Sequence, residues 1–323
     1  MNVAEKAVRG ADRFHQRRRW LAFPYAVVKK FGDDEAGNLA ALVAYYGFFS
    51  VFPLMLVFVT ILGMVLRGNT GLQDSIVRSA LAKFPVVGTQ ISNNIHSLTG
   101  SGLALGVGIA LTLWAGLGVV KVMQTAMNTV WNVPYRYRPN FLRSTIRALI
   151  MLAVLGVITV ASAAAGSVGA ASHTWWRVAI GLLVSLLLNF VLFMLAFRVL
   201  TTENVSWGDV RPGAIIGAVA WTVLQALGGY YVAHQLRGAS DTYGTLAAVI
   251  GLLAWIYLGA QVTLFAAEVN VVKKRRLWPR GIVQPPLTEA DERALSDYAK
   301  QQERRPEERV DVTIDADGHR RAG

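Results

Sequence analysis

The sequence contains no cysteine, and this absence removes several kinds of chemistry at once. Without thiols the chain has no disulfide framework, no thiolate nucleophile and no cysteine-ligated metal, and it gives no sign of its redox compartment. Charged residues are also scarce. Asp, Glu, Lys and Arg make up 16% of the chain, whereas an ordinary soluble domain carries about a quarter. With 54% hydrophobic residues, the composition is too apolar for a single soluble core.

Acidic residues and histidines are sparse in the central part of the chain. The five histidines stand singly, and no pair of them has the spacing of a metal site. No glycine-rich loop precedes a Lys-Ser or Lys-Thr pair that would hold a phosphate. We therefore expect no catalytic residues, no metal and no cofactor, and we disfavour an enzyme. Between residues 36 and 267 there are four acidic residues, each in an expected loop: Asp74, Glu203, Asp209 and Asp241.

Long uncharged stretches dominate what is present. A bilayer core is crossed by about 20 apolar residues in a helix. Runs of this length without period-2 alternation are helices rather than barrel strands, because backbone polar groups in lipid must be satisfied within the segment. We expect an all-α, polytopic membrane protein with about six transmembrane helices. The six stretches free of Asp, Glu, Lys, Arg and His are residues 40–66, 103–120, 148–172, 178–197, 213–233 and 244–267.

Basic residues predict the orientation. With a cytoplasmic N-terminus, 27 of the 32 Lys and Arg residues fall in inner segments and 5 in outer ones. Cytoplasmic segments of membrane proteins carry such an excess of positive charge. The two tails supply 20 of the 27, and the loops between spans favour the same orientation by 7 to 5. We predict that both termini are cytoplasmic, with a juxtamembrane segment at 1–37, a transmembrane domain at 38–272 and a basic tail at 273–323.

The segment before the first span mixes aromatic and basic residues. Such a segment suits the inner leaflet, where aromatic rings lie at the interface and each cation near anionic lipid contributes about 1 kcal/mol. We therefore expect the bilayer and anionic lipid headgroups as partners. A nucleic-acid surface is the sharper alternative, which we disfavour because topology already explains a basic segment here. The residues are Phe14, Trp20, Phe23, Tyr25, Arg13, Arg17, Arg18, Arg19, Lys29 and Lys30.

Two further segments have helical signals outside the spans. Apolar residues recur at helical spacing in 72–84 and 91–98, which predicts two short amphipathic helices that pack on the bundle or rest on headgroups. In the tail, Thr288 and Asp291 form a capping box for a solvated helix through Ala299. The tail beyond Pro286 has no apolar periodicity able to dock on the bundle, so we expect it to be dispensable for folding. From Glu303 onward we expect disorder.

Polar groups inside spans are the default functional candidates, because each must find a partner away from water. The alternative is hydrogen bonding between helices, worth about 0.6–2 kcal/mol each. Pro53 in the first span frees a backbone carbonyl and predicts a kink that serves as a hinge or as a packing device. The polar candidates in or beside the spans are Tyr45, Tyr46, Ser50, Asn128, Gln225, Gln261 and Glu268.

Opposite charges stand at the inner ends of two spans. The second and sixth spans both run from outside to inside, so Lys121 and Glu268 are expected at one depth. Pairing would let the carboxylate keep its charge near hydrocarbon and pin the two helices. The alternative is that both side chains reach headgroup water separately. Arg147 and Arg198 also fall at inner helix ends and are alternative partners for Glu268.

Three motifs resemble those of a known family. The first span reads LAALVAYYGFFSVFPLMLVF, the second region LWAGLGVVKVMQTAMNTVWNVP and the last SDTYGTLAAVIGLLAWIYLGAQVTLFAAEVN. Residues 33–274 thereby resemble the YihY family of bacterial inner-membrane proteins, also called the virulence factor BrkB family and formerly mislabelled ribonuclease BN. The last motif adds Asp241, Tyr243 and Gly244 to the candidate positions. The resemblance implies six spans, a cytoplasmic-membrane location and a link to envelope integrity or to movement of an amphiphile.

Two functions from different classes follow from these observations. The first is a transporter or translocator of a lipid or another amphiphile, and the second is a non-catalytic envelope scaffold with oligomeric or envelope partners. A ribonuclease is disfavoured by the scarcity of acids and histidines. Convergence of Tyr45, Ser50, Gln225 and Gln261 on one water-filled cavity would favour transport, whereas dispersed pairwise contacts would favour a scaffold.

Overall fold

The computed structural model describes residues 3–65, 102–170, 175–234 and 236–314. Within these ranges all regular secondary structure is helical, which confirms the all-α prediction. The two amphipathic helices expected at 72–84 and 91–98 lie outside the described residues.

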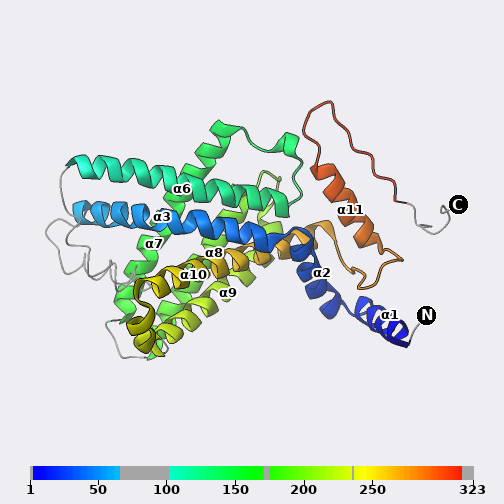
Figure 1. Ribbon diagram of the computed structural model, residues 1–323, viewed down its shortest axis with the longest axis horizontal. Coiled ribbons are helices and arrows are strands. Elements are labelled where there is room, and N and C mark those ends of the chain that lie inside the picture. The colour runs from blue at the N-terminus through cyan, green and yellow to red at the C-terminus, as the bar shows by residue number, and fades with distance from the viewer. Residues whose placement is uncertain (1–2, 66–101, 171–174, 235, 315–323) are drawn as a thin grey trace.

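Six long helices form the body of the protein (Figure 1). The shortest has 26 residues, which at about 1.5 Å per residue exceeds the roughly 30 Å of a bilayer core. Four of them carry a candidate span by length and composition, and α3 carries a shorter apolar window over Ala36–Val51. The polytopic class is therefore confirmed. The helices are α3 (Ala36–Val65), α6 (Gly102–Val130), α7 (Phe141–Ala170), α8 (Trp175–Leu200), α9 (Trp207–His234) and α10 (Leu236–Arg275).

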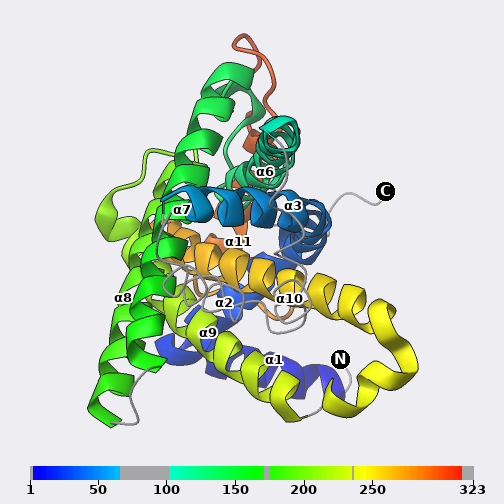
Figure 2. The same ribbon diagram turned by 90° about the vertical axis from the view of Figure 1, so that its left-hand side faces the viewer.

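The six helices pack against one another in a closed ring of contacts. Figure 2 shows α7 and α8 along one side of the bundle, with α3, α10 and α9 beside them. Following the ring, α3 contacts α6, α6 contacts α7, α7 contacts α8, α8 contacts α9, α9 contacts α10, and α10 returns to α3. Helix α10 also touches α6 across the ring. Large side chains such as Met127, Trp131, Phe197 and Leu264 are fully buried in the resulting core.

Helices α9 and α10 approach each other closely because two glycines lie at their contact. A Cβ atom at Gly213 would overlap the backbone carbonyl oxygen of Ala266, and one at Gly217 would press on Phe193. Small residues let helix backbones approach in this way within a membrane. The amide N–H of Gly213 donates to the Asn270 side-chain oxygen at 2.6 Å, which ties the start of α9 to α10.

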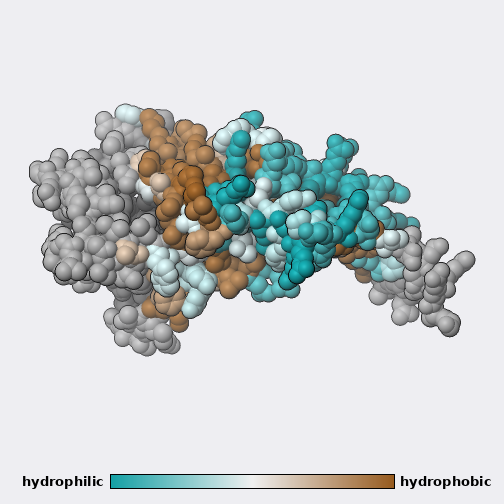
Figure 3. All heavy atoms as spheres, turned by 90° about the horizontal axis from the view of Figure 1, so that it is seen from above, coloured by the Kyte–Doolittle hydropathy of each residue, from teal (hydrophilic) through white to brown (hydrophobic). Residues whose placement is uncertain are grey.

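The segments predicted to be cytoplasmic gather at one end, which we call the polar end. It consists of α1 (Val3–Gln16), α2 (Arg19–Asp33), the loops at 131–140 and 201–206, and residues 276–314 with α11 (Glu289–Gln301). Figure 3 shows hydrophilic residues over this end and an apolar band across the helices beside it. The structure is therefore consistent with the predicted order of spans and connecting loops. That the polar end faces the cytoplasm stays a prediction.

Helix α2 is part of the bundle and not only a surface segment. Its buried residues Ala22, Ala26, Val27 and Lys30 recur at helical spacing and form one face. This face packs on α10, and α3 follows after a residue with positive φ, Glu35. The predicted domain boundaries at 37/38 and 272/273 fall in the first turn of α3 and the last turn of α10.

The tail docks on the bundle, so the expectation of an undocked tail is wrong. The capping box of Thr288 and Asp291 is confirmed, and the helix continues to Gln301. Ala290, Ala294 and Asp291 are buried. The lack of an apolar stripe in the sequence did not exclude docking, because polar side chains contribute to the contact.

Disorder beginning at Glu303 is also wrong for the start of that segment. Glu303 is 5% exposed and pairs with Arg136 of the loop after α6 at 2.9 Å. The Arg136 guanidinium also donates to the Glu308 carbonyl. Residues 303–314 have no regular secondary structure, yet the first of them are held against the polar end.

Candidate functional site

A buried charge cluster lies where α2, α10 and α11 meet. Lys30 Nζ lies 2.6 Å from Asp34 Oδ2 and 3.3 Å from Glu268 Oε2, and it donates to the Val130 carbonyl at 2.9 Å. The side chains of Lys30 and Glu268 are 0% exposed and that of Asp34 is 1% exposed. With Tyr298 of α11, these residues form what we call the Lys30 cluster. Charges buried this completely are rare unless they are paired.

Local sequence explains how the cluster assembles. Lys30 and Asp34 are four residues apart, so they lie one above the other at the end of α2. Asp34 is the C-cap residue of α2 and lies two residues before the start of α3. Glu268 projects from the buried last turns of α10, whose residues from Ala266 to Val272 are all buried.

Tyr298 covers the cluster from the tail. Its ring centroid lies 5.6 Å from Lys30 Nζ. Burial raises the pKa of Tyr298, and the nearby carboxylates Asp34, Asp33 and Glu268 raise it further by repelling a phenolate. Tyr298 therefore stays a neutral phenol across the physiological range, with an O–H group facing the carboxylates.

The expected pairing of Glu268 with Lys121 is not the one that forms. Lys121 Nζ instead lies 3.9 Å from the centroid of the Phe141 ring at the start of α7. Glu268 faces α2 and meets Lys30. We had treated Lys30 as a cation for lipid headgroups. The spacing of Ala22, Ala26 and Lys30 along one face of α2 was the signal that could have placed it in the core.

A second charged node attaches the tail to α2. Asp291 is buried and accepts hydrogen bonds from Arg280 Nε at 2.6 Å and from the Gly281 amide at 2.9 Å. Lys29 Nζ lies 3.2 Å from the same carboxylate. Burial alone raises the pKa of Asp291, but the hydrogen bonds from Arg280, Gly281 and Thr288 outweigh it and hold the pKa well below its ordinary value.

Fewer of the N-terminal basic residues are therefore available to lipid headgroups than the sequence predicted. Lys29 and Lys30 are used within the protein. The exposed basic residues of this segment are Arg13, Arg17, Arg18 and Arg19, and Trp20 beside them is 67% exposed. These residues remain available for the predicted contact with anionic headgroups, which stays a prediction.

Asn128 lies in the last turn of α6 and ties this helix to the loop at 201–206. Its side-chain oxygen accepts from the Thr202 amide at 2.8 Å, and it is 3% exposed. Close by, Asn132 Nδ2 donates to Gln301 of α11 at 3.2 Å. In α10, Arg275 donates to the Trp131 carbonyl at 2.6 Å. Asn128 is thus one of several side chains that hold the helix ends and loops of the polar end together.

The polar candidates within the spans do not converge. Ser50 donates to the Gly47 carbonyl in its own helix, and Gln261 donates to the Tyr257 hydroxyl in its own helix. Tyr45 and Tyr46 are exposed and contact each other edge to face, and Gln225 is half-buried on α9. Four candidates have side chains outside the described residues: Pro53 in α3, and Asp241, Tyr243 and Gly244 in α10.

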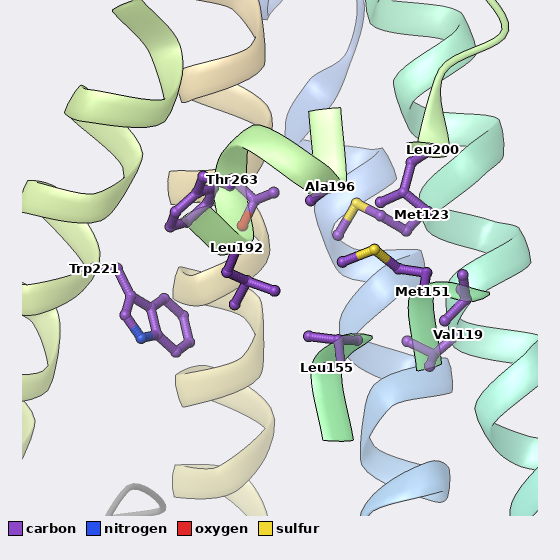
Figure 4. Close-up of a pocket in the computed structure, with 11 residues that line it drawn as sticks. Val119, Met123, Met151, Leu155, Leu192, Ala196, Leu200, Trp221 and Thr263 are labelled. Atoms are coloured by element: carbon purple, nitrogen blue, oxygen red, sulfur yellow. The ribbon is translucent and has the colours of Figure 1, made fainter. Parts of the chain in front are cut away.

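An apolar cavity of about 250 Å³ lies between α6, α7, α8, α9 and α10 (Figure 4). Thr263 contributes the one hydroxyl among its lining residues, and this hydroxyl donates to the Gly259 carbonyl of its own helix. Of the predicted polar candidates whose side chains the structure describes, none lines the cavity. The lining residues are Val119, Val120, Met123, Met151, Leu155, Leu192, Phe193, Ala196, Leu200, Trp221 and Thr263.

A ring of long apolar helices with ion pairs closing one end defines a multi-pass α-helical membrane protein. The chain belongs to the virulence factor BrkB family, whose family model matches residues 27–286. This match confirms the family suggested by the three sequence motifs.

Two of three similar proteins are named as membrane proteins, one of them of the inner membrane, which places this chain in the cytoplasmic membrane. The inner membrane protein YhjD of Escherichia coli is 25% identical over 296 residues, covering 84% of this chain and 87% of YhjD. The putative ribonuclease-like protein YfkH of Bacillus subtilis is 22% identical, covering 79% of this chain and 96% of YfkH. The UPF0761 membrane protein Smlt0865 of Stenotrophomonas maltophilia is 28% identical, covering 80% of this chain and 62% of its own length. No solved structure matches.

Proposed function

We propose that the protein binds the acyl chain of a lipid-like amphiphile inside the helix ring and moves that amphiphile in the cytoplasmic membrane. The cavity between α6 and α10 is the observation that carries the proposal. Ligand sites are typically concave and mostly apolar. Cavities lined almost wholly by hydrocarbon stay dry, so an acyl chain meets no competition from bound water there.

The position of the cavity suits an amphiphile with an anionic head. Thr263 lies five residues before Glu268 on α10, which places the cavity roughly 7.5 Å from the Lys30 cluster along the helix axis. Arg147 lies one turn before Met151, and Arg198 lies two residues before Leu200. Cations therefore stand beside the end of the cavity nearest the polar end, where a headgroup would lie.

Amphiphile binding has a direct test. A phospholipid with a photoreactive group on its acyl chain should cross-link to peptides of α7 and α8 in membranes. Ala196→Phe fills the cavity from a position that is 6% exposed. We expect this variant to lose most of the cross-link while its melting temperature in detergent is kept or raised. The matched control is Ala153→Phe on the exposed side of α7, which should cross-link like the parent.

Movement is tested separately in vesicles. Parent protein should speed the transfer of a fluorescent phospholipid between leaflets, and Ala196→Phe should abolish that increase. Cross-linking without transfer would leave a lipid-binding protein and overturn translocation. If Ala196→Phe keeps both the cross-link and the lipid transfer, the cavity is not the binding site.

A non-catalytic scaffold is the second candidate, and one observation favours it. Ser50 and Gln261 bond within their own helices and Asn270 accepts from the Gly213 amide of the neighbouring helix, so these side chains make separate local contacts instead of lining a shared aqueous path. This arrangement disfavours a hydrophilic substrate. It leaves an apolar chain as the part of a substrate that the described interior can hold.

A further inference from the structure

The Lys30 cluster contains more negative than positive charge. It holds one ammonium group, on Lys30, and two carboxyl groups, on Asp34 and Glu268. All three side chains are at most 1% exposed. Two ionised carboxylates would therefore bury a net negative charge, which costs several kcal/mol and is avoided when the group becomes neutral.

The surrounding elements supply no second cation to the cluster. Among the described residues, the ion pairs of Asp34 and Glu268 are made with Lys30 alone. The neighbouring cations are used elsewhere: Arg280 of the loop before α11 pairs with Asp33 and Asp291, Lys29 of α2 with Asp291, and Arg275 of α10 with Glu203 and Asp297. From α6 the cluster meets only the neutral Val130 carbonyl, and from α11 the phenol Tyr298.

Hydrogen bonding shows the same imbalance. Among the described residues, three acceptors of the cluster have no hydrogen-bond partner, Glu268 Oε1, Glu268 Oε2 and Asp34 Oδ1, and the Tyr298 hydroxyl is the one unpaired group that could donate to them. Buried acceptors without partners are uncommon in folded proteins. A proton on one carboxyl group turns an acceptor into a donor, so the pair can share a hydrogen bond and the surplus charge disappears. One added proton thus removes the surplus negative charge and supplies a donor to the unpaired acceptors.

The geometry indicates which carboxyl group carries the proton. Asp34 accepts a short hydrogen bond from Lys30, which favours its ionised form. Glu268 has only the longer 3.3 Å contact with Lys30. We propose that the Lys30 cluster is a proton-binding site, in which Glu268 holds a proton taken from cytoplasmic water while Asp34 and Lys30 stay ionised. The site does not depend on the apolar cavity or on translocation.

Proton binding links stability to pH in a defined direction. In the unfolded chain a glutamate releases its proton above about pH 4.3. If the folded protein keeps it, the folded state binds one more proton than the unfolded state, so stability falls as pH rises. The folding equilibrium constant should fall by up to about tenfold per pH unit while the folded protein retains the proton. Glu268→Gln removes this slope.

Infrared spectroscopy of the full chain in lipid nanodiscs tests the site. At neutral pH we expect the carbonyl band of a protonated carboxyl group, absent from Glu268→Gln. The band should also vanish in Asp34→Asn, because the surplus charge is then gone and Glu268 can ionise opposite Lys30. Asp34→Asn keeps the test decisive if Glu268→Gln fails to fold. The matched control is Glu292→Gln on the exposed face of α11, which should retain the band.

Three outcomes would overturn the proposal. The first is a parent protein with no protonated carboxyl band at neutral pH. The second is a band that persists unchanged in Glu268→Gln. The third is a melting temperature that responds to sodium at constant ionic strength and not to pH, since this would assign the site to a metal cation instead of a proton.

Discussion

The polar end and the apolar part of the ring are held together by different means. At the polar end, residues far apart in sequence meet through charged hydrogen bonds, as Arg136 with Glu303 and Lys29 with Asp291 do. In the apolar part, helices meet through close backbone packing, as at Gly213. Charged pairs have one good geometry, whereas apolar contacts can repack. The comparison indicates that charged contacts fix the helix ends at the polar end, while apolar packing between the spans leaves the cavity open.

Removing the central cation should have the largest effect on this arrangement. Lys30→Met leaves Asp34 and Glu268 buried without their cation, and we expect a loss of about 3–5 kcal/mol in the free energy of unfolding at neutral pH. Thermal unfolding in detergent measures it. The control is Lys29→Met, because Lys29 is 20% exposed and Asp291 keeps Arg280. Equal losses in both variants would contradict a special role for the Lys30 cluster.

The attachment of the tail should respond to pH. Asp291→Asn removes the charge that meets Arg280, and we expect a loss of about 2–3 kcal/mol at neutral pH. The pKa of Asp291 is lowered in the folded protein, so its ionised form stabilises the fold above the ordinary value of about 3.9. This contribution is lost as pH falls below that value, so the difference between variant and parent should shrink in acid.

Melting curves of parent and Asp291→Asn between pH 3 and pH 7 would show this convergence. A constant difference across that range would mean that the charge of Asp291 is not what holds the tail. Deleting residues 288–323 should then destabilise the protein at neutral pH, contrary to expectation from the sequence alone.

Close packing in the apolar part should tolerate less volume at one glycine than at another. Gly213→Ala places a methyl group against the Ala266 carbonyl, and we expect a loss of about 1–3 kcal/mol. Gly181 of α8 has no atom within 4 Å of the added carbon, so Gly181→Ala should be neutral or stabilise by about 0.5–1 kcal/mol. Detergent melting temperatures would separate the two. A harmless Gly213→Ala would show that α9 and α10 can shift apart.

The difference between the polar end and the apolar part of the ring also explains which features the sequence could predict. Apolar stretches of membrane length are a local property of the chain, so the six helices and the capping box at Thr288 could be identified in advance. The contacts of the polar end join residues a hundred or more positions apart, such as Lys30 with Val130 and Lys29 with Asp291. Charge counting assigned both lysines to the lipid surface because it has no information on which face of α2 is covered.

The cavity could not be predicted from the sequence either. Its lining residues come from five helices, and all but Thr263 are ordinary apolar residues of a span. Only the packing of the ring brings Met151 of α7 and Thr263 of α10 to one space. The polar candidates Ser50 and Gln261 were drawn from the right helices, but their side chains bond within those helices, a choice that depends on rotamers.

The smallest effect is expected at Lys121, the residue that the sequence argument had paired with Glu268. Its ammonium group lies over the ring of Phe141, which is 78% exposed, and such an exposed cation–π contact contributes about 0.5–1 kcal/mol. Lys121→Met should therefore lower the free energy of unfolding by no more than that. Since Lys121 and Glu268 share no contact, Lys121→Glu and Glu268→Lys should act additively within about 0.5 kcal/mol. Recovery of stability in the double swap would show that the two charges meet after all, and it would displace Lys30 as the partner of Glu268.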